Sequence, residues 1–232
     1  MTAAGIVSVA IVIPALNAAT VLPATLAALK AGSPRLSVET IVVDGSSTDA
    51  TVECARANGA RTIAAPRGRG TQLAAGAAAT ESQWLLFMHA DTRLDSGWAD
   101  AILAHLARSD AARQAAYFRF ALDDASPAAR RIERLAGWRA RVLALPYGDQ
   151  GLFLSRSLYD AVGGYRPLVL MEDVDLVRRL GRHRLVGLEA RAVTSADRYR
   201  RDGFWLRPLR NLFYLGLFVA GVPPRLIARL YG

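Results

Sequence analysis

The residues His89, Ala90 and Asp91 follow directly after a short apolar run at 84–88. A continuous apolar run of this length is typical of a strand that is covered on both faces of a sheet. In an open α/β sheet, ligands bind just beyond the carboxyl ends of the strands. A carboxylate at such a strand end can hold a hard divalent cation against a phosphate, although an aspartate there can also simply stabilise a turn. Asp91 is therefore a candidate metal ligand.

Polar or glycine-rich sequence also follows the other predicted strands of the first half, at Asn17, at Asp44 and in the loop 67–70. Arg67 can pair with phosphate oxygens, and the glycines of its loop let the backbone approach a ligand closely. Asp44 can accept hydrogen bonds from a base or a ribose hydroxyl. Because the carboxyl ends of parallel strands meet at one edge of a sheet, these groups predict a nucleotide site. The dinucleotide fingerprint G-x-G-x-x-G does not follow the first strand.

A second acidic group lies far along the chain, where Glu172 and Asp173 open a predicted helix. Acidic residues suit the positive N-terminal end of a helix, which is the simplest interpretation of the pair. A carboxylate within hydrogen-bonding reach of a sugar hydroxyl can also take its proton during attack. The pair is thus a candidate general base as well as a helix start.

Four apolar segments in the first half predict strands, at 7–13, 38–43, 61–65 and 84–88. Helical segments follow them, at 21–29, 46–59, 71–80 and 97–107. Strands separated by single helices predict an α/β fold with a mostly parallel central sheet, right-handed crossovers and helices on both faces. The second half predicts a two-faced strand at 117–122, a charged helix at 127–141 and a buried strand at 152–155.

The composition describes a globular protein, since 52% of the 232 residues are hydrophobic and 21% are charged. The single cysteine, Cys54, excludes an internal disulfide and favours a reducing, cytoplasmic compartment. The net charge is +9, and the whole excess falls in residues 178–232, which hold 12 arginines against three acidic residues. This basic segment suits a phosphate-rich partner or an anionic surface, or else forms a solvated face.

The stretch 204–232 is predicted to form a basic and apolar helical tail after a main domain at 1–203. Its uncharged run at 211–222 is shorter than the about 20 apolar residues that span a bilayer. Arginines flank the run, as in helices that lie on an anionic membrane surface. Docking on the sheet or on a second subunit, as in a homodimer, remains an alternative. Long apolar stretches between the arginines disfavour nucleic acid as a partner.

Six motifs, in this order and spacing, resemble those of a family 2 glycosyltransferase with the GT-A fold. They are IVIPALN (11–17), IVVDGSSTDAT (41–51), RGRGTQLAAGAAA (67–79), LLFMHADT (85–92), GDQGLFLSRSLYDAVGGY (148–165) and MEDVDLVRRL (171–180). The resemblance is greatest to a small bacterial group with a His-Ala-Asp-Thr element. It implies transfer of a sugar from a nucleotide-diphosphate donor, linked to UDP or GDP, to a hydroxyl acceptor with inversion.

The resemblance also implies roles for individual residues. Asp173 matches the catalytic base, with Glu172 beside it, and Asp91 matches the aspartate that coordinates Mg²⁺ or Mn²⁺. The acceptor and sugar would be contacted by Asp149, Gln150 and Arg201. The residues implied to bind the nucleotide sugar are Pro14, Asn17, Asp44, Arg67, Gly68, Gly70, Gln72, His89, Ala90 and Asp91.

Two positions depart from the pattern of this family. Position 89 is histidine where many relatives have the first aspartate of the DXD motif, so a cation has one carboxylate fewer; His89 is open to roles as a ligand, a nucleotide contact or a turn residue. Position 18 is alanine where relatives often have glutamate. The main hypothesis is an inverting glycosyltransferase at the inner face of the cell membrane, with an acceptor that is lipid-linked or hydrophobic. The alternatives are a nucleotidyltransferase and a nucleotide-sugar-binding protein without turnover.

Overall fold

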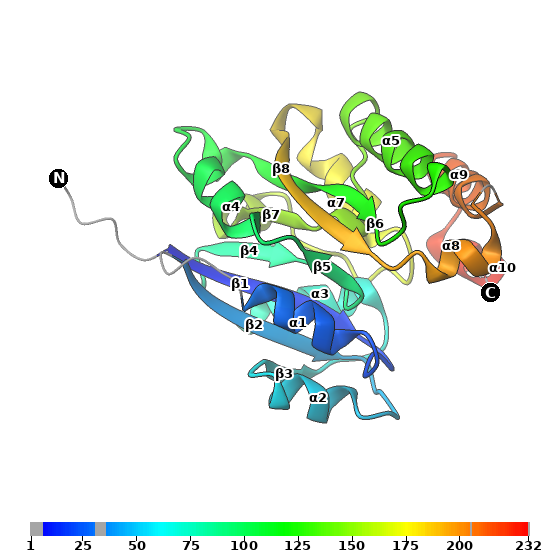
Figure 1. Cartoon of the computed structure of the whole chain (residues 1–232). Coiled ribbons are helices and arrows are strands. Elements are labelled where there is room, and N and C mark those ends of the chain that lie inside the picture. Colours follow the sequence, from blue (N-terminus) through cyan, green and yellow to red (C-terminus); the bar gives the residue numbers. More distant parts are fainter. Residues whose placement is uncertain (1–6, 31–35, 205, 232) are drawn as a thin grey trace.

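A computed structural model describes residues 7–30, 36–204 and 206–231 and shows one curled, eight-stranded sheet with the strand order β3-β2-β1-β4-β7-β6-β8-β5 (Figure 1). Its strands β1 to β4, β6 and β8 pair in parallel, whereas β7 and β5 pair antiparallel to their neighbours. The predicted α/β fold with a mostly parallel sheet is therefore confirmed. The strands are β1 (Val7–Ala15), β2 (Leu36–Asp44), β3 (Arg61–Ala64), β4 (Trp84–Phe87), β5 (Thr92–Leu94), β6 (Ala115–Leu122), β7 (Leu152–Ser155) and β8 (Leu185–Thr194).

Helices cover both faces of the sheet, as the alternation of side chains along β1 requires. Val9, Ile11 and Ile13 pack on one side with the first, second and fourth helices, while Ala10 and Val12 pack on the other with the third and seventh (Figure 1). The helices are α1 (Leu22–Leu29), α2 (Thr51–Ala57), α3 (Arg69–Ala78), α4 (Trp98–Leu106), α5 (Pro127–Val142), α6 (Arg156–Ala161), α7 (Glu172–Leu180), α8 (Asp197–Asp202), α9 (Leu206–Val219) and α10 (Pro224–Tyr231), with short 3₁₀ turns at Ala111–Arg113, Gly148–Gln150 and Arg182–Arg184.

The short strand β5 fixes the segment that follows β4. It begins at Thr92 and pairs antiparallel with β8, which itself pairs with β6. Thr92 is fully buried, and its hydroxyl lies 3.3 Å from that of Thr194. Thr25 of α1 donates a hydrogen bond of 2.7 Å to the carbonyl of Ala90. Asp91 is therefore held between two anchored residues.

The C-terminal helices have one side packed within the chain and one side in solvent. Tyr214 and Leu215 of α9 and Ile227 of α10 are buried, and the hydroxyl of Tyr214 donates to the carbonyl of Leu230 at 2.6 Å. The other side of α9 carries large exposed apolar side chains, among them Leu209. Among the described residues, the structure has no helix with the length and apolar content needed to traverse a bilayer.

Candidate active site

The end of β1 and the loop after it form one side of a cleft of about 620 Å³. Asn17 adopts a left-handed backbone conformation (φ 50°), and its side-chain oxygen accepts a 2.8 Å hydrogen bond from the amide of Thr48. The Ser47 hydroxyl accepts a hydrogen bond from the Asn17 amide at 2.9 Å, so the loop after β1 and the loop after β2 hold each other in place. Among the predicted nucleotide-sugar residues, those that line the cleft are Pro14, Asn17, Arg67, Gly68, Gln72, His89, Ala90 and Asp91.

Two of the predicted ligand contacts are engaged with the chain itself. The carboxylate of Asp44 accepts hydrogen bonds of 3.1 Å from the amides of Ser46 and Ser47, and Asp44 does not line the cleft. Gln72 is buried, and its amide nitrogen donates to the carbonyls of Ala15 at 2.9 Å and Val43 at 2.7 Å. The hydrogen bonds of both side chains therefore stabilise the backbone at the ends of β1 and β2.

Gly68, at the N-cap of α3, and Gly70, in its first turn, are required for different structural reasons. Gly68 has φ 142°, a conformation that side chains rarely adopt. A Cβ at Gly70 would lie 2.2 Å from the carbonyl oxygen of Arg166, because the 166–168 backbone packs directly on it. Gly70 thus permits an approach of the chain's own backbone, and Gly70 is not among the residues lining the cleft.

His89, Gly148 and Asp173 meet where the cleft adjoins a second, small cavity. The Asp173 carboxylate accepts a 2.8 Å hydrogen bond from the Gly148 amide. A Cβ at Gly148 would lie 2.5 Å from His89 Nε2 and 3.5 Å from Asp173 Oδ2. His89 lines both the cleft, with Asp91, and the small cavity, with Asp173. Asp91 and Asp173, the two predicted carboxylates, are both half-buried, and the cavities that they line meet at His89.

Glu172, next to Asp173, has a different environment. Its side chain is 2% exposed and lies 3.5 Å from the guanidinium of Arg69. Burial, and secondarily the charge of Asp173, raise the pKa of Glu172 to about 7, against the opposing effect of Arg69. The residue before it, Met171, has φ 66°, a strained conformation of the kind that gathers at functional sites.

Asp149 also belongs to this acidic group. Burial raises its pKa to about 6; Arg139 acts against the shift, and the negative charges of Asp173 and Asp91 add to it. Its Oδ1 atom is buried and has no hydrogen-bond partner in the described part of the chain. A buried carboxylate oxygen without a donor is costly, so Asp149 is available to a polar ligand group.

The other two predicted acceptor contacts lie elsewhere. Gln150 is buried: its amide nitrogen donates to the carbonyl of Phe118 at 3.0 Å, and its oxygen accepts from Arg139 at 3.3 Å. Arg139 also stacks on the ring of Tyr147 at 3.3 Å, which secures the turn that holds Asp149. Arg201 is exposed on α8 and does not line the cleft.

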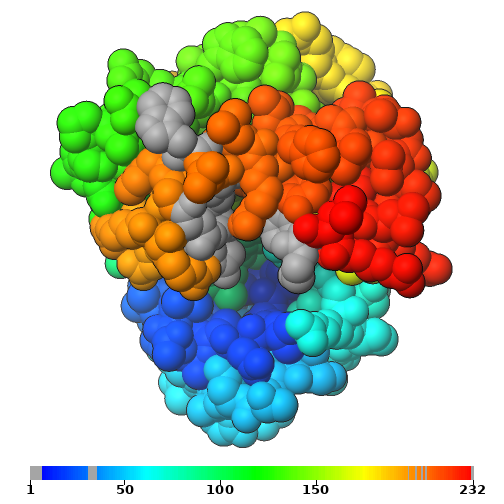
Figure 2. Space-filling view, turned by 90° about the vertical axis from the view of Figure 1, so that its right-hand side faces the viewer, coloured from blue at the N-terminus to red at the C-terminus, as the bar shows by residue number. Residues whose placement is uncertain are grey.

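Some residues of the site were not singled out from the sequence. Arg69 lines the cleft and pairs with Glu172, so it links the start of α3 to the start of α7. The outer wall is completed by Val169, Leu170 and Ala228, the last from α10. Figure 2 shows the hollow between the blue N-terminal surface and the orange and red C-terminal helices. Arg69 lies within the motif at 67–79, so the sequence contained a signal for it. The residues of the outer wall are brought together only by long-range packing, which leaves no local signal.

The side chains of the cleft fit a cation that is shared with a ligand. The described residues include no group of three or more His, Cys, Asp or Glu that could hold a metal ion alone. Asp91 offers one carboxylate in a cleft that also contains Arg67 and Arg69. Mg²⁺ is commonly bound by one or two carboxylates together with substrate phosphates, and the donor set here suits that arrangement.

The sheet and the converging strand ends define an α/β protein of the nucleotide-binding type. The sequence model described as glycosyl transferase family 2 matches residues 10–167, and the chain belongs to this family. An uncharacterized glycosyltransferase of Mycobacterium tuberculosis is 36% identical over 100 residues, which span 43% of this chain and 44% of that protein. The corresponding protein of Mycobacterium bovis matches equally.

Solved glycosyltransferase structures share the fold. Glucosyl-3-phosphoglycerate synthase of Mycobacterium tuberculosis, in complex with Mn²⁺, UDP and glucosyl-3-phosphoglycerate, has a TM-score of 0.56 at 19% identity, with 81% of this chain and 70% of that chain covered. TarS 1–349 of S. aureus, in complex with UDP, has a TM-score of 0.61 at 15% identity, with 84% and 62% covered. The predicted GT-A fold is thus confirmed.

Proposed function

We propose that the protein transfers a sugar from a nucleotide-diphosphate donor to a hydroxyl acceptor, with inversion at the anomeric carbon. The observation that carries this proposal is the meeting of the Asp91 cleft and the Asp173 cavity at His89. Both solved relatives hold UDP, which supports UDP as the nucleotide of the donor. The cleft of about 620 Å³ is in the size range of small-molecule sites.

The donor would lie in the cleft with its diphosphate toward Arg67 and Arg69. Guanidinium groups pair well with phosphate oxygens, and both arginines line this space. Asp91 would hold Mg²⁺ or Mn²⁺ jointly with the diphosphate, and the cation would offset the charge that gathers on the leaving group. Metal-containing complexes of the mycobacterial relative support this assignment.

Asp173 would act as the base that accepts the proton of the attacking hydroxyl. Its carboxylate is held by the Gly148 amide and is half-buried, so it is oriented and still reachable. Inversion in one displacement needs a single base. Glu172 would position it from behind, because it is buried and tied to Arg69. Asp149 would accept a hydrogen bond from a hydroxyl of the sugar or the acceptor, with Gln150 and Arg201 as further predicted contacts.

The C-terminal helices would rest on an anionic membrane surface and bring a lipid-linked or hydrophobic acceptor within reach. The exposed side of α9 carries Leu209, Leu212 and Phe213, and residues 204–232 hold four arginines and no acidic residue. An apolar stripe flanked by arginines suits the boundary between headgroups and acyl chains. Together with the single cysteine, which favours a reducing compartment, the proposal includes a cytoplasmic location peripheral to the membrane.

Substitution of Asp173 by Asn tests the proposed chemistry. A thermal-shift screen over UDP- and GDP-sugars with Mn²⁺ first selects the donor, and release of the nucleotide diphosphate is then measured. Asp173→Asn should slow this release by about 100-fold to 10,000-fold, because the carboxamide cannot take a proton. Its thermal shift with the donor should persist. Asp100→Asn, on the exposed start of α4, is the matched control. Release at the wild-type rate in Asp173→Asn would remove it as the base.

A further inference from the structure

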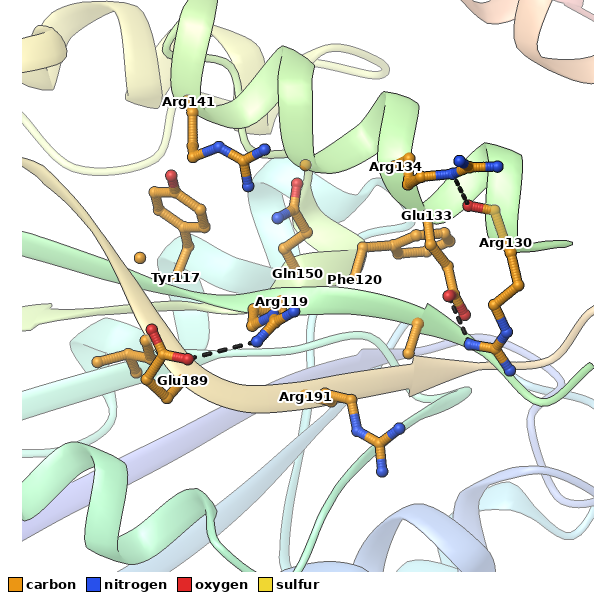
Figure 3. A pocket seen from close by; sticks show the side chains of 14 residues that line it. Tyr117, Arg119, Phe120, Arg130, Glu133, Arg134, Arg141, Gln150, Glu189 and Arg191 are labelled. Atoms are coloured by element: carbon orange, nitrogen blue, oxygen red, sulfur yellow. Dashed lines mark hydrogen bonds and ion pairs between the residues drawn. The ribbon is translucent and has the colours of Figure 1, made fainter. Parts of the chain in front are cut away.

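A second large hollow lies between α5 and the strands β6 and β8. Its volume is about 850 Å³, and it shares no lining residue with the cleft. Figure 3 shows side chains from α5 and from both strands facing this groove. Five arginines and two glutamates line it. The arginines are Arg119, Arg130, Arg134, Arg141 and Arg191, and we call this hollow the α5 groove.

Three of these arginines have carboxylate partners. Arg119 pairs with Glu189 at 3.3 Å, Arg130 with Glu133, and Arg191 with Asp95 at 3.5 Å. Arg134 and Arg141 pair with no carboxylate in the described part of the chain. The α5 groove therefore has a surplus of positive charge contributed by two residues of one helix, two turns apart.

The geometry around Arg141 leaves its charge facing the groove. Arg141 reaches into the same space as the Tyr117 ring, above Gln150 (Figure 3). A Cβ at Gly137 would lie 3.2 Å from Arg141 Nη1, so the glycine leaves room for the guanidinium to lie along the helix. A glycine inside a helix costs about 1 kcal/mol relative to alanine. Burial raises the pKa of the Tyr117 hydroxyl against the opposing charge of Arg141, and this hydroxyl can donate a hydrogen bond to an anion.

An apolar surface adjoins the groove at Arg134. This side chain also lines a separate hollow of about 430 Å³, whose other walls are apolar carbons of Ile132, Leu135 and Phe204 together with Ala128 and the stem of Arg131. Leu135 is 54% exposed and Trp138 is 49% exposed, and Val142 follows them at helical spacing. A different stripe of α5, at Ala129, Ile132, Ala136 and Ala140, already packs on the sheet.

Helix α5 thus has two apolar stripes where packing on the sheet requires one. Of the 13 large apolar side chains exposed in the described residues, four belong to α5 and its C-cap, and seven belong to α9 and α10. Phe204 packs beside Ile132 of α5, and Figure 2 shows the green surface of α5 next to the orange C-terminal surface. Concentration of exposed apolar residues on one side marks an interaction surface.

We propose that the α5 groove binds the phosphate headgroup of an anionic membrane lipid, while Leu135 and Trp138 contact its acyl region. Arg134 donates only its Nε to the Arg130 carbonyl, at 3.3 Å, so the guanidinium groups of Arg134 and Arg141, which have no carboxylate partner among the described residues, match a phosphate. The neighbouring apolar surface matches the hydrocarbon next to it. A free phosphorylated metabolite would use the groove without the apolar stripe, and the phosphates of a nucleic acid would use the arginines without the apolar hollow. The proposal uses Arg134 and Arg141, neither of which lines the donor cleft.

The double variant Arg134→Gln/Arg141→Gln tests this proposal by cosedimentation of the whole protein with vesicles. Phosphatidylcholine vesicles containing phosphatidic acid should bind the wild-type protein, and the double variant should bind them about 30-fold more weakly, given the usual contribution of each arginine near an anionic surface. Arg56→Gln/Arg113→Gln removes the same charge from exposed positions on α2 and next to α4, and should bind nearly as the wild type does. Equal binding by both double variants would overturn the proposal.

Two further measurements distinguish the sources of phosphate and keep the proposal falsifiable. Quenching of tryptophan emission by brominated acyl chains should fall in Trp138→Phe, and unchanged quenching would contradict contact with the acyl region. Inorganic phosphate at millimolar concentration should not displace the protein from the vesicles. Displacement by inorganic phosphate, or by a short RNA at lower concentration, would assign the groove to a soluble anion or to nucleic acid instead. Donor turnover by Arg134→Gln/Arg141→Gln in the absence of vesicles should equal that of the wild type.

Discussion

Adjacent carboxylates in this site differ because one is buried and the other is oriented by a backbone amide. Glu172 is buried and lies against Arg69, whereas Asp173 is half-buried, and both line the small cavity that His89 shares. The sequence could identify the pair but not divide the roles, since both lie in the first turn of one helix. The division depends on the Gly148 turn and the loop before α3, which are distant in the chain.

Glu172→Gln should flatten the pH dependence of stability. The pKa of Glu172 is about 7 in the folded protein, above its ordinary value of 4.5. Between these pH values the folded state binds more protons than the unfolded chain, so the free energy of unfolding falls as the pH rises. Glutamine removes this contribution. Urea unfolding at several pH values measures it, and identical slopes for Glu172→Gln and the wild type between pH 4.5 and 7 would contradict the assigned environment.

At the same scale, two residues show the limit of motif-based assignment. Gln72 and Gln150 are in recognised motifs and are predicted to contact ligands; in the structure their amide groups bond to carbonyls of neighbouring strands, and Gln72 also lines the cleft. A buried glutamine satisfies its donors and acceptors with whatever lies beside it, and that is decided by packing. A motif therefore indicates that a residue matters to the site without indicating whether it contacts the substrate.

At the scale of elements, the N-terminal strand and helix pattern was predictable and the outer edge of the sheet was not. The first four strands are apolar runs separated by helices, which is a strong local signal. The strands β5 and β8 were not predicted. β5 has three residues, and β8 alternates buried and exposed positions within an arginine-rich segment, so neither forms a continuous apolar run. Their pairing, which anchors Asp91, exists only in the folded sheet.

Gly70→Ala should destabilise the contact between α3 and the segment before α7. The added methyl group would meet the Arg166 carbonyl, so the backbone must shift at a cost of about 1–3 kcal/mol. Gly216→Ala on α9 has open space around it and should be neutral or stabilise by about 1 kcal/mol, since alanine favours the helix. Urea denaturation compares the two. A loss below the measurement error in Gly70→Ala would show that the 166–168 segment yields easily.

At the scale of the whole molecule, the C-terminal helices contribute both to the wall of the donor cleft and to an exposed apolar surface. Ala228 closes the donor cleft and Ile227 is buried, so removal of the tail would also open the site. The exposed side of α9 can be altered separately. The sequence predicted a tail at 204–232 from its charge and apolar run, but the side that faces the domain follows from the packing of α9 and α10 on each other.

Leu209→Ser/Phe213→Ser tests the membrane role of this tail without disturbing its packed side. Both side chains are exposed, so the thermal stability should change little. Binding to anionic vesicles should weaken by about tenfold or more, because the apolar contact with the bilayer is lost. Sedimentation velocity without lipid tests the alternative, in which this surface forms a dimer. Dissociation of a dimer in the double variant, with unchanged vesicle binding, would assign the surface to a second copy of the chain.

The central claim is that Asp91 and Asp173 have different roles in one crevice. Asp91 holds the cation and the donor, and Asp173 takes the proton of the acceptor. Calorimetric titration of UDP in the presence of Mn²⁺ tests it most directly, with the wild type, Asp91→Asn and Asp173→Asn side by side. The gain in UDP affinity that Mn²⁺ provides should disappear in Asp91→Asn and persist in Asp173→Asn. An unchanged gain in Asp91→Asn, or its loss in Asp173→Asn, would contradict this division.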